Sequence, residues 1–169
     1  MTGLEYISRI EALRQFLSKY NHADCVTVEG QGSLEEFIDR SFAMPRWVMW
    51  LFHIRKILAV ILRLRHDEFF QDGYNQAPQE IPKQINRTIG PFIVRAYEPD
   101  SYYVLESGED RHLEANLIYA KESKCEGNSR FHILTIVRYK HWTGRLYFAI
   151  VLPFHYLIIH QMSRQGLRN

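Results

Sequence analysis

The stretch FIVRAYEPDSYYVLESGEDRHLEANLIYAKESKCEGNSRFHILTIVRYKH, residues 92–141, decides the fold. It contains four runs rich in β-branched and aromatic residues, at 92–97, 101–106, 112–121 and 130–141, and such runs are typical of strands. Only short segments of turn-forming residues separate them, whereas parallel neighbours would need crossovers of about a dozen residues or more. The stretch therefore predicts four antiparallel strands joined in a meander.

A long apolar helix is predicted after the meander. Residues 144–165 place apolar side chains at helical spacing along one side: Tyr147, Val151, Phe154, Ile158 and Met162. Thr143 is expected to cap this helix and Gly166 to end it. Pro153 should kink or split the helix, because proline removes a backbone donor and crowds the preceding turn.

The part of the chain before the meander is predicted to be mostly helical. Apolar residues at three- and four-residue steps predict a helix over 4–20, and a β-branched segment predicts a strand over 24–29. Ser33 has capping-box spacing to a glutamate, so a second helix should begin there, and Pro45 begins a third with one apolar and one basic side. Residues 66–90 predict a long loop, which is either a candidate gate or a variable insertion.

Composition and charge limit the class of protein. A length of 169 residues suits one domain, and 46% hydrophobic with 24% charged residues is typical of folded soluble proteins. Lys and Arg number 21 against 19 Asp and Glu, which gives no reason to expect a nucleic-acid partner. The most apolar segments, 42–64 and 146–159, are respectively too basic and too short for a transmembrane span. With no secretory signal pattern, the expected location is the cytoplasm.

The sequence contains no common metal or cofactor motif. Cys25 and Cys125 are too far apart to form a Cys-x-x-Cys pair, and none of the eight histidines has metal-ligand spacing to another. Glycine-rich phosphate loops and nucleophile elbows are also absent from the sequence. We therefore expect no metal and no cofactor.

Two predicted strands carry polar residues that could form a site. His112, Glu114 and Asn116 alternate along one strand and so share a face, which is either an exposed polar face or part of a ligand site. Thr135 and Tyr139 share a face of the next strand, where an ordinary sheet core and an amphiphilic pocket are both open. If the protein is an enzyme, His112 is the candidate acid or base and Glu114 would set its tautomer.

Several motifs, in matching order, resemble the bacterial domain-of-unknown-function family 2867. They are Met44-Pro45-Arg46-Trp47-Val48, Leu51-Phe52-His53-Ile54-Arg55, Glu109-Asp110-Arg111-His112-Leu113-Glu114, Thr135-Ile136-Val137-Arg138-Tyr139, Gly144-Arg145-Leu146-Tyr147-Phe148 and Pro153-Phe154-His155. The resemblance covers about residues 24–168. In that family the third motif usually continues like His-Leu-Asp-Phe-Arg, whereas this chain has His-Leu-Glu-Ala-Asn at 112–116.

This family is similar to the START-like helix-grip superfamily, which also includes polyketide cyclases, aromatase/cyclases and the birch-pollen allergen class of hydrophobic-ligand binders. The resemblance implies an α+β fold in which a curved antiparallel sheet wraps a long C-terminal helix, with helices after the first strand and an extra N-terminal helix. It also implies a single helix-grip domain over 23–169, preceded by an N-terminal helical extension over 1–22.

The expected function is binding of a small hydrophobic or amphiphilic molecule between the sheet and the C-terminal helix. The candidate ligand-binding residues are Trp47, Trp50, His112, Glu114, Asn116, Thr135, Tyr139, Tyr147, Phe154, His155 and Ile158. One alternative is a cyclase-, hydratase- or isomerase-type enzyme that uses the same cavity. A second is a module whose basic 47–65 helix or N-terminal helix binds another protein or a membrane surface. The oligomeric state is left open.

Overall fold

The computed structural model describes residues 2–43, 81–89, 92–107, 112–124 and 127–168. The helix predicted to begin at Pro45 and most of the loop predicted over 66–90 lie outside the described residues.

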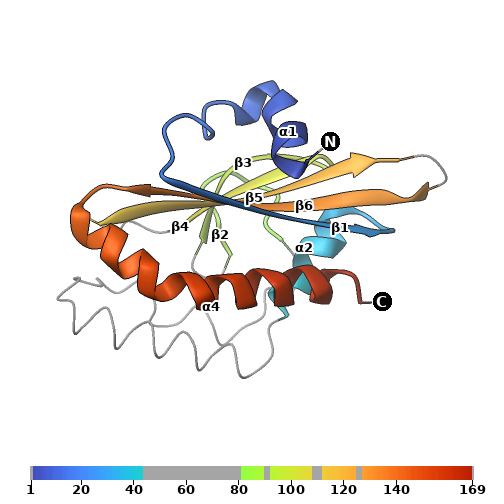
Figure 1. Cartoon of the computed structure of the whole chain (residues 1–169). Helices are drawn as coiled ribbons and strands as arrows, with labels where there is room; N and C mark the ends of the chain where they lie inside the picture. The colour runs from blue at the N-terminus through green and yellow to red at the C-terminus, as the bar shows by residue number, and fades with distance from the viewer. Residues whose placement is uncertain (1, 44–80, 90–91, 108–111, 125–126, 169) are drawn as a thin grey trace.

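A six-stranded antiparallel sheet in the order β1-β6-β5-β4-β3-β2 forms the centre of the fold (Figure 1). Its strands are β1 (His22–Gly30), β2 (Thr88–Ile89), β3 (Phe92–Glu98), β4 (Tyr102–Ser107), β5 (Leu113–Ser123) and β6 (Ser129–Tyr139). Strand β3 pairs with β4, β4 with β5 and β5 with β6, which confirms the predicted meander. The first strand pairs with the last, so β1 and β6 lie side by side.

Helices cover both faces of the sheet, and Figure 1 shows α1 on one side and α2 with α4 on the other. Within the described residues the helices are α1 (Gly3–Arg9), the short 3-10 helix η1 (Glu11–Leu13), α2 (Leu34–Phe42) and α4 (Trp142–Gly166). One apolar core therefore lies between the sheet and α1 with η1. On the other face, a second core lies beneath α2 and the end of α4, and a third lies beneath the start of α4. The α+β architecture, with its long C-terminal helix, is the predicted one.

The N-terminal segment differs from the single helix predicted over 4–20. Helix α1 ends at Arg9 because Ile10 adopts an extended backbone conformation, and η1 follows directly. This change of direction lets Ile7 and Leu13, both fully buried, pack against the same face of the sheet. Burial of two apolar side chains thus outweighs continuation of the helix.

The helix caps are confirmed only in part. The Ser33 hydroxyl accepts from the Glu36 amide at 3.2 Å, but the Glu36 carboxylate pairs with Arg40 rather than returning to the cap. The N-cap of α4 is His141, not Thr143, and Thr143 Oγ1 instead lies 2.6 Å from His112 Nδ1. Because the Thr143 hydroxyl contacts His112 of another element, it does not act as the N-cap of α4.

Helix α4 ends at Gly166 as predicted, but Pro153 does not split it. Proline at 153 leaves the carbonyl of Ala149 without its helical donor, and both residues are exposed. Because water can satisfy a carbonyl on the exposed side, the helix continues through the proline.

Two glycines hold α4 at its ends. A Cβ atom at Gly144 would lie 2.1 Å from the His112 carbonyl oxygen, and one at Gly166 would lie 2.5 Å from Phe37 Cε2 of α2. Tyr147 and Phe148 are buried near the first end, and Ile159 and Met162 near the second. No residue of the intervening stretch 149–158 is buried, and Val151, Leu152 and Ile158 pack against the sheet only as half-buried residues, so the helix is packed more tightly at its ends than in its middle.

We predict that Gly144→Ala lowers the free energy of unfolding by about 2 kcal/mol, because the new methyl group overpacks against a backbone carbonyl. Alanine in an exposed helix position would instead stabilise by roughly 0.5–1 kcal/mol. The control is Gly127→Asn, since Gly127 has a left-handed φ of 75° but no atom within 4 Å of its added Cβ. Urea denaturation of both variants measures the difference; equal stability of Gly144→Ala and the parent chain would contradict the prediction.

Candidate functional site

Polar residues of β1 and β6 lie on the sheet face that α4 covers. In the register of these strands, Asp24 pairs with Thr135 and His22 pairs with Val137. Val137 packs in the same apolar cluster as Tyr147 of α4, which identifies the face. Because side chains alternate along a strand, His22, Asp24 and Thr135 all point toward α4.

Aromatic and imidazole rings of α4 surround these polar side chains. The Phe148 ring lies 5.0 Å from His22 and 6.1 Å from His155, and the Tyr156 ring lies 6.4 Å from His22. His155 Nε2 is 3.9 Å from Asp24 Oδ2, which is beyond hydrogen-bond distance but close enough for an ion pair. We call this group the Asp24 site; its members are His22, Asp24, Thr135, Phe148, His155 and Tyr156.

Three polar atoms of the Asp24 site have no hydrogen-bond partner within the part of the chain that the structure describes. They are His22 Nε2, Asp24 Oδ2 and Thr135 Oγ1, and each is buried. Buried polar atoms in native proteins are nearly always hydrogen-bonded, and an unmet one costs about 1–3 kcal/mol. The Asp24 carboxylate, the Thr135 hydroxyl and the His22 imidazole lie beside apolar rings, and together they offer both donors and acceptors to the polar group of an amphiphile.

The structure brings together several of the residues predicted for the site. Thr135 and His155 are members of the Asp24 site, and Tyr139 and Tyr147 belong to the adjoining apolar cluster with Phe148. The rings of Tyr139 and Phe148 are 6.0 Å apart. Two further candidates lie on the loosely packed middle of α4, Phe154 and Ile158. Trp47 and Trp50 lie outside the described residues.

Glu114 and Asn116 share a face, as predicted, but it is the face that α1 covers. Asn116 pairs in register with Ile136, a member of the core beneath α1, and Glu114 pairs with Arg138 through a salt bridge. The sheet therefore separates these two side chains from the Asp24 site.

His112 lies just before β5 and contacts the beginning of α4. Its carbonyl oxygen accepts from the amides of Lys140 at 2.9 Å and His141 at 3.2 Å, while its ring faces Thr143. These contacts fix the start of α4 on the sheet. The predicted pairing of His112 with Glu114 is not among the contacts that the described residues show, since Glu114 pairs with Arg138.

Sequence reasoning missed four members of the Asp24 site: His22, Asp24, Phe148 and Tyr156. The signal for His22 and Asp24 was present, because the strand predicted to begin at Asp24 begins at His22. Extending the strand by two residues would have placed both side chains on one face. Phe148 and Tyr156 gave no such signal, since apolar residues occur on every side of α4.

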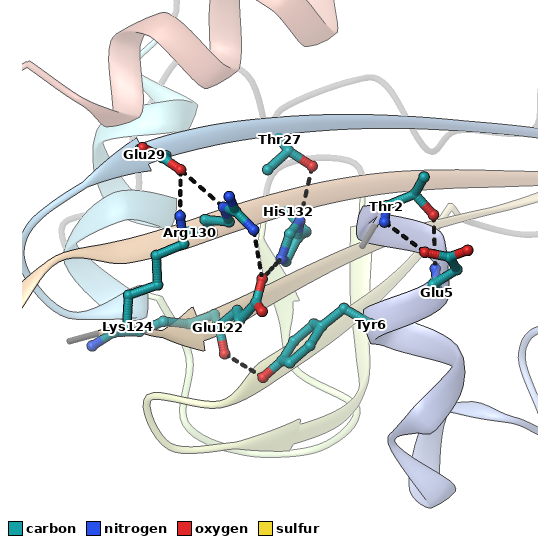
Figure 2. Close-up of polar contacts among 10 residues, drawn as sticks. Thr2, Glu5, Tyr6, Thr27, Glu29, Glu122, Lys124, Arg130 and His132 are labelled. Atoms are coloured by element: carbon teal, nitrogen blue, oxygen red, sulfur yellow. Dashed lines mark hydrogen bonds and ion pairs between the residues drawn. The ribbon is translucent and has the colours of Figure 1, made fainter.

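A second polar cluster surrounds His132 on the face beneath α1 (Figure 2). The His132 ring is 1% exposed; its Nδ1 lies 2.9 Å from Thr27 Oγ1 and its Nε2 lies 3.3 Å from Glu122 Oε2. The ring of Tyr6 from α1 packs 5.1 Å away, and its hydroxyl donates to the Lys121 carbonyl. Burial lowers the pKa of His132, so the ring is neutral near pH 7.

Other ionisable groups on this face are held in unreactive states. Hydrogen bonds from Lys124 and Arg130 lower the pKa of the Glu29 carboxyl to about 2. Burial raises the pKa of the Cys25 thiol to about 11, which keeps it protonated and therefore a poor nucleophile. These residues support the sheet rather than supply chemistry.

Taken together, a curved antiparallel sheet crossed by a long C-terminal helix defines an α+β protein of helix-grip-like architecture. The family model described as "Protein of unknown function (DUF2867)" matches residues 16–162, and the chain belongs to that family. A solved structure, described as a conserved protein from Geobacillus kaustophilus, is similar over 86% of this chain and 93% of its own, with 8% identity and a TM-score of 0.42. No curated protein matches the chain.

His132 predicts a loss of stability in mild acid. In the unfolded chain its pKa is near 6.5, above the lowered folded value, so below about pH 7 the unfolded state binds the proton more readily. The free energy of unfolding should therefore fall as the pH falls through 6.5, and His132→Gln should reduce this slope. His160→Gln, at an exposed position of α4, is the control. Identical slopes for His132→Gln and the parent chain in urea titrations would refute the assignment.

Proposed function

We propose that the chain binds a small amphiphilic molecule between the sheet and the middle of α4, at the Asp24 site. The observation that carries this proposal is the group of buried, unmatched polar atoms on His22, Asp24 and Thr135 beneath a helix segment with no buried residue. A ligand that donates a hydrogen bond to Asp24 would offset their desolvation.

The neighbouring side chains suit the apolar part of such a ligand. Aromatic and aliphatic surface along α4 comes from Tyr147, Phe148, Phe154 and Ile158. Such a surface beside a few polar groups is typical of pockets for small molecules. An acceptor carboxylate beside imidazoles favours a ligand whose polar end carries a hydroxyl or an amine. The resemblance to the helix-grip superfamily, which includes hydrophobic-ligand binders, supports the same proposal.

Native mass spectrometry of the purified chain, followed by organic extraction, tests the proposal directly. We expect a stoichiometric adduct with an extractable apolar portion and a hydrogen-bond donor at its polar end. A mass equal to that of the bare chain, together with no heat of binding for any of a panel of long-chain alcohols and amines, would count against it.

Thr135→Val separates a ligand-binding role from a structural one. Removing a buried hydroxyl that has no partner should raise the free energy of unfolding of the ligand-free chain by about 1 kcal/mol. The same change should weaken retention of the ligand, because a ligand hydrogen bond is lost. Thermal melts and native mass spectrometry measure the two effects.

Thr27→Val is the matched control on the neighbouring strand. It removes the hydroxyl that bonds His132 at 2.9 Å on the opposite face, so it should destabilise the chain and leave ligand retention unchanged. Destabilisation by both substitutions would show that Thr135 is an ordinary structural residue.

Catalysis at the same site is a second candidate, favoured by the 3.9 Å separation of Asp24 and His155. A carboxylate facing an imidazole can hold the ring for proton transfer to or from a bound molecule. Once the ligand is identified, Asp24→Asn should lower turnover by about 10²-fold or more with a smaller effect on binding. Equal losses of turnover and binding would assign Asp24 to binding alone.

A further inference from the structure

The outer side of α4 exposes large apolar side chains along much of its length. Their exposed fractions are 71% for Trp142, 48% for Leu146, 38% for Ile150 and 56% for Leu157. Successive members are four, four and seven residues apart, so they lie on one side of the helix. Apolar patches of this kind on a folded chain commonly mark a surface that binds a partner.

Every charge on this helix and its flanks is positive. The chain has no Asp or Glu from residue 140 to its last residue, and the charged side chains there are Lys140, Arg145, Arg164 and Arg168. Arg145 and Arg164 are exposed on α4 itself. An apolar stripe accompanied only by cations is complementary to an apolar surface that carries negative charge.

We propose that the outer side of α4 binds the surface of an anionic lipid bilayer, with the helix lying in the plane of that surface. This goes beyond ligand binding at the Asp24 site and does not depend on it. Leu146, Ile150 and Leu157 would enter the apolar boundary of the bilayer, while the arginines contact lipid phosphates. Trp142, at the start of the stripe, is of the residue type that is enriched at membrane interfaces.

The fold favours a helix that lies on the bilayer over one that crosses it. With 25 residues, α4 has the length and the apolar composition of a membrane-crossing helix. The apolar segment 146–159, which the sequence alone indicated, is too short to cross. The inner side of α4, however, buries Tyr147, Phe148, Ile159 and Met162 against the rest of the chain. Crossing would separate these contacts, whereas lying on the surface keeps them.

Charge also argues against two other occupants of this side. Two copies meeting through α4 would bring Arg145 and Arg164 of one helix toward the same cations of the other. The segment 46–65 of this chain has only basic charges, so it would meet α4 with like charge as well. Anionic phospholipid has neither disadvantage.

Co-sedimentation with vesicles tests the proposal. We expect the full chain to sediment with phosphatidylcholine vesicles that contain phosphatidylglycerol, and less so when salt is raised or phosphatidylglycerol is omitted. Leu157→Glu should weaken binding about tenfold, because an apolar side chain no longer enters the bilayer. Arg145→Glu should weaken it about fivefold or more on the anionic vesicles.

Ile85→Glu is the matched control, because Ile85 is 57% exposed but lies outside α4, just before β2. It should bind the vesicles as the parent chain does. Trp142→Glu changes the most exposed apolar residue of α4 and provides a second test of the stripe. Thermal melts establish that each variant is folded.

Three results would overturn the proposal. The first is no sedimentation of the parent chain with either vesicle. The second is unchanged binding by all three folded α4 variants, and the third is equal weakening by Ile85→Glu. Unchanged binding by the α4 variants would point instead to the basic segment 46–65. A dimer of the parent chain that Leu157→Glu dissociates, without vesicle binding, would assign this side to a second copy.

Discussion

The position of α4 depends on two close backbone approaches that only glycine permits. Gly144 meets the carbonyl of His112 at one end of the helix, and Gly166 meets α2 at the other. Between these two ends no residue from 149 to 158 is buried, and Val151, Leu152 and Ile158 are only half-buried against the clusters of the sheet. The two ends hold α4 across the face that carries His22, Asp24 and Thr135, so the Asp24 site depends on how the helix is held.

Both faces of the sheet bury polar side chains, and the two groups differ in how closely their members approach one another. Beneath α1, His132 has Thr27 within 2.9 Å and Glu122 within 3.3 Å, and the Tyr6 ring closes the cluster. Beneath α4, Asp24 and His155 are 3.9 Å apart and the Thr135 hydroxyl has no partner among the described residues. Buried atoms without a hydrogen-bond partner in the described residues occur on the α1 face as well, where they include Glu122 Oε2 and His132 Nε2. Those two atoms lie within ion-pair distance of each other at 3.3 Å, whereas the polar atoms of the Asp24 site are farther from their neighbours. The wider spacing leaves room for a group from another molecule.

Sequence patterns predicted the meander and which side chains share a face, but not which helix each face meets. Alternation correctly grouped Glu114 with Asn116, and it placed Thr135 with Tyr139, because the side-chain period of a strand is fixed by its geometry. Both faces of this sheet are covered, so polarity could not tell the α1 face from the α4 face. The cap of α4 was misplaced for a similar reason: Thr143 bonds His112, a partner 31 residues away that no local pattern reveals.

The sequence of α4 also does not reveal which environment each side of the helix meets. A helix that is apolar on every side is ordinarily one that is buried on every side, either in a large core or in a bilayer. Here the inner side meets the sheet, but Trp142, Leu146 and Leu157 of the outer side remain exposed. Solvent alone gives no physical reason to keep large apolar residues at these positions without one acidic residue among them. The composition of the outer side is therefore better explained by a second, apolar and anionic environment than by the demands of the fold.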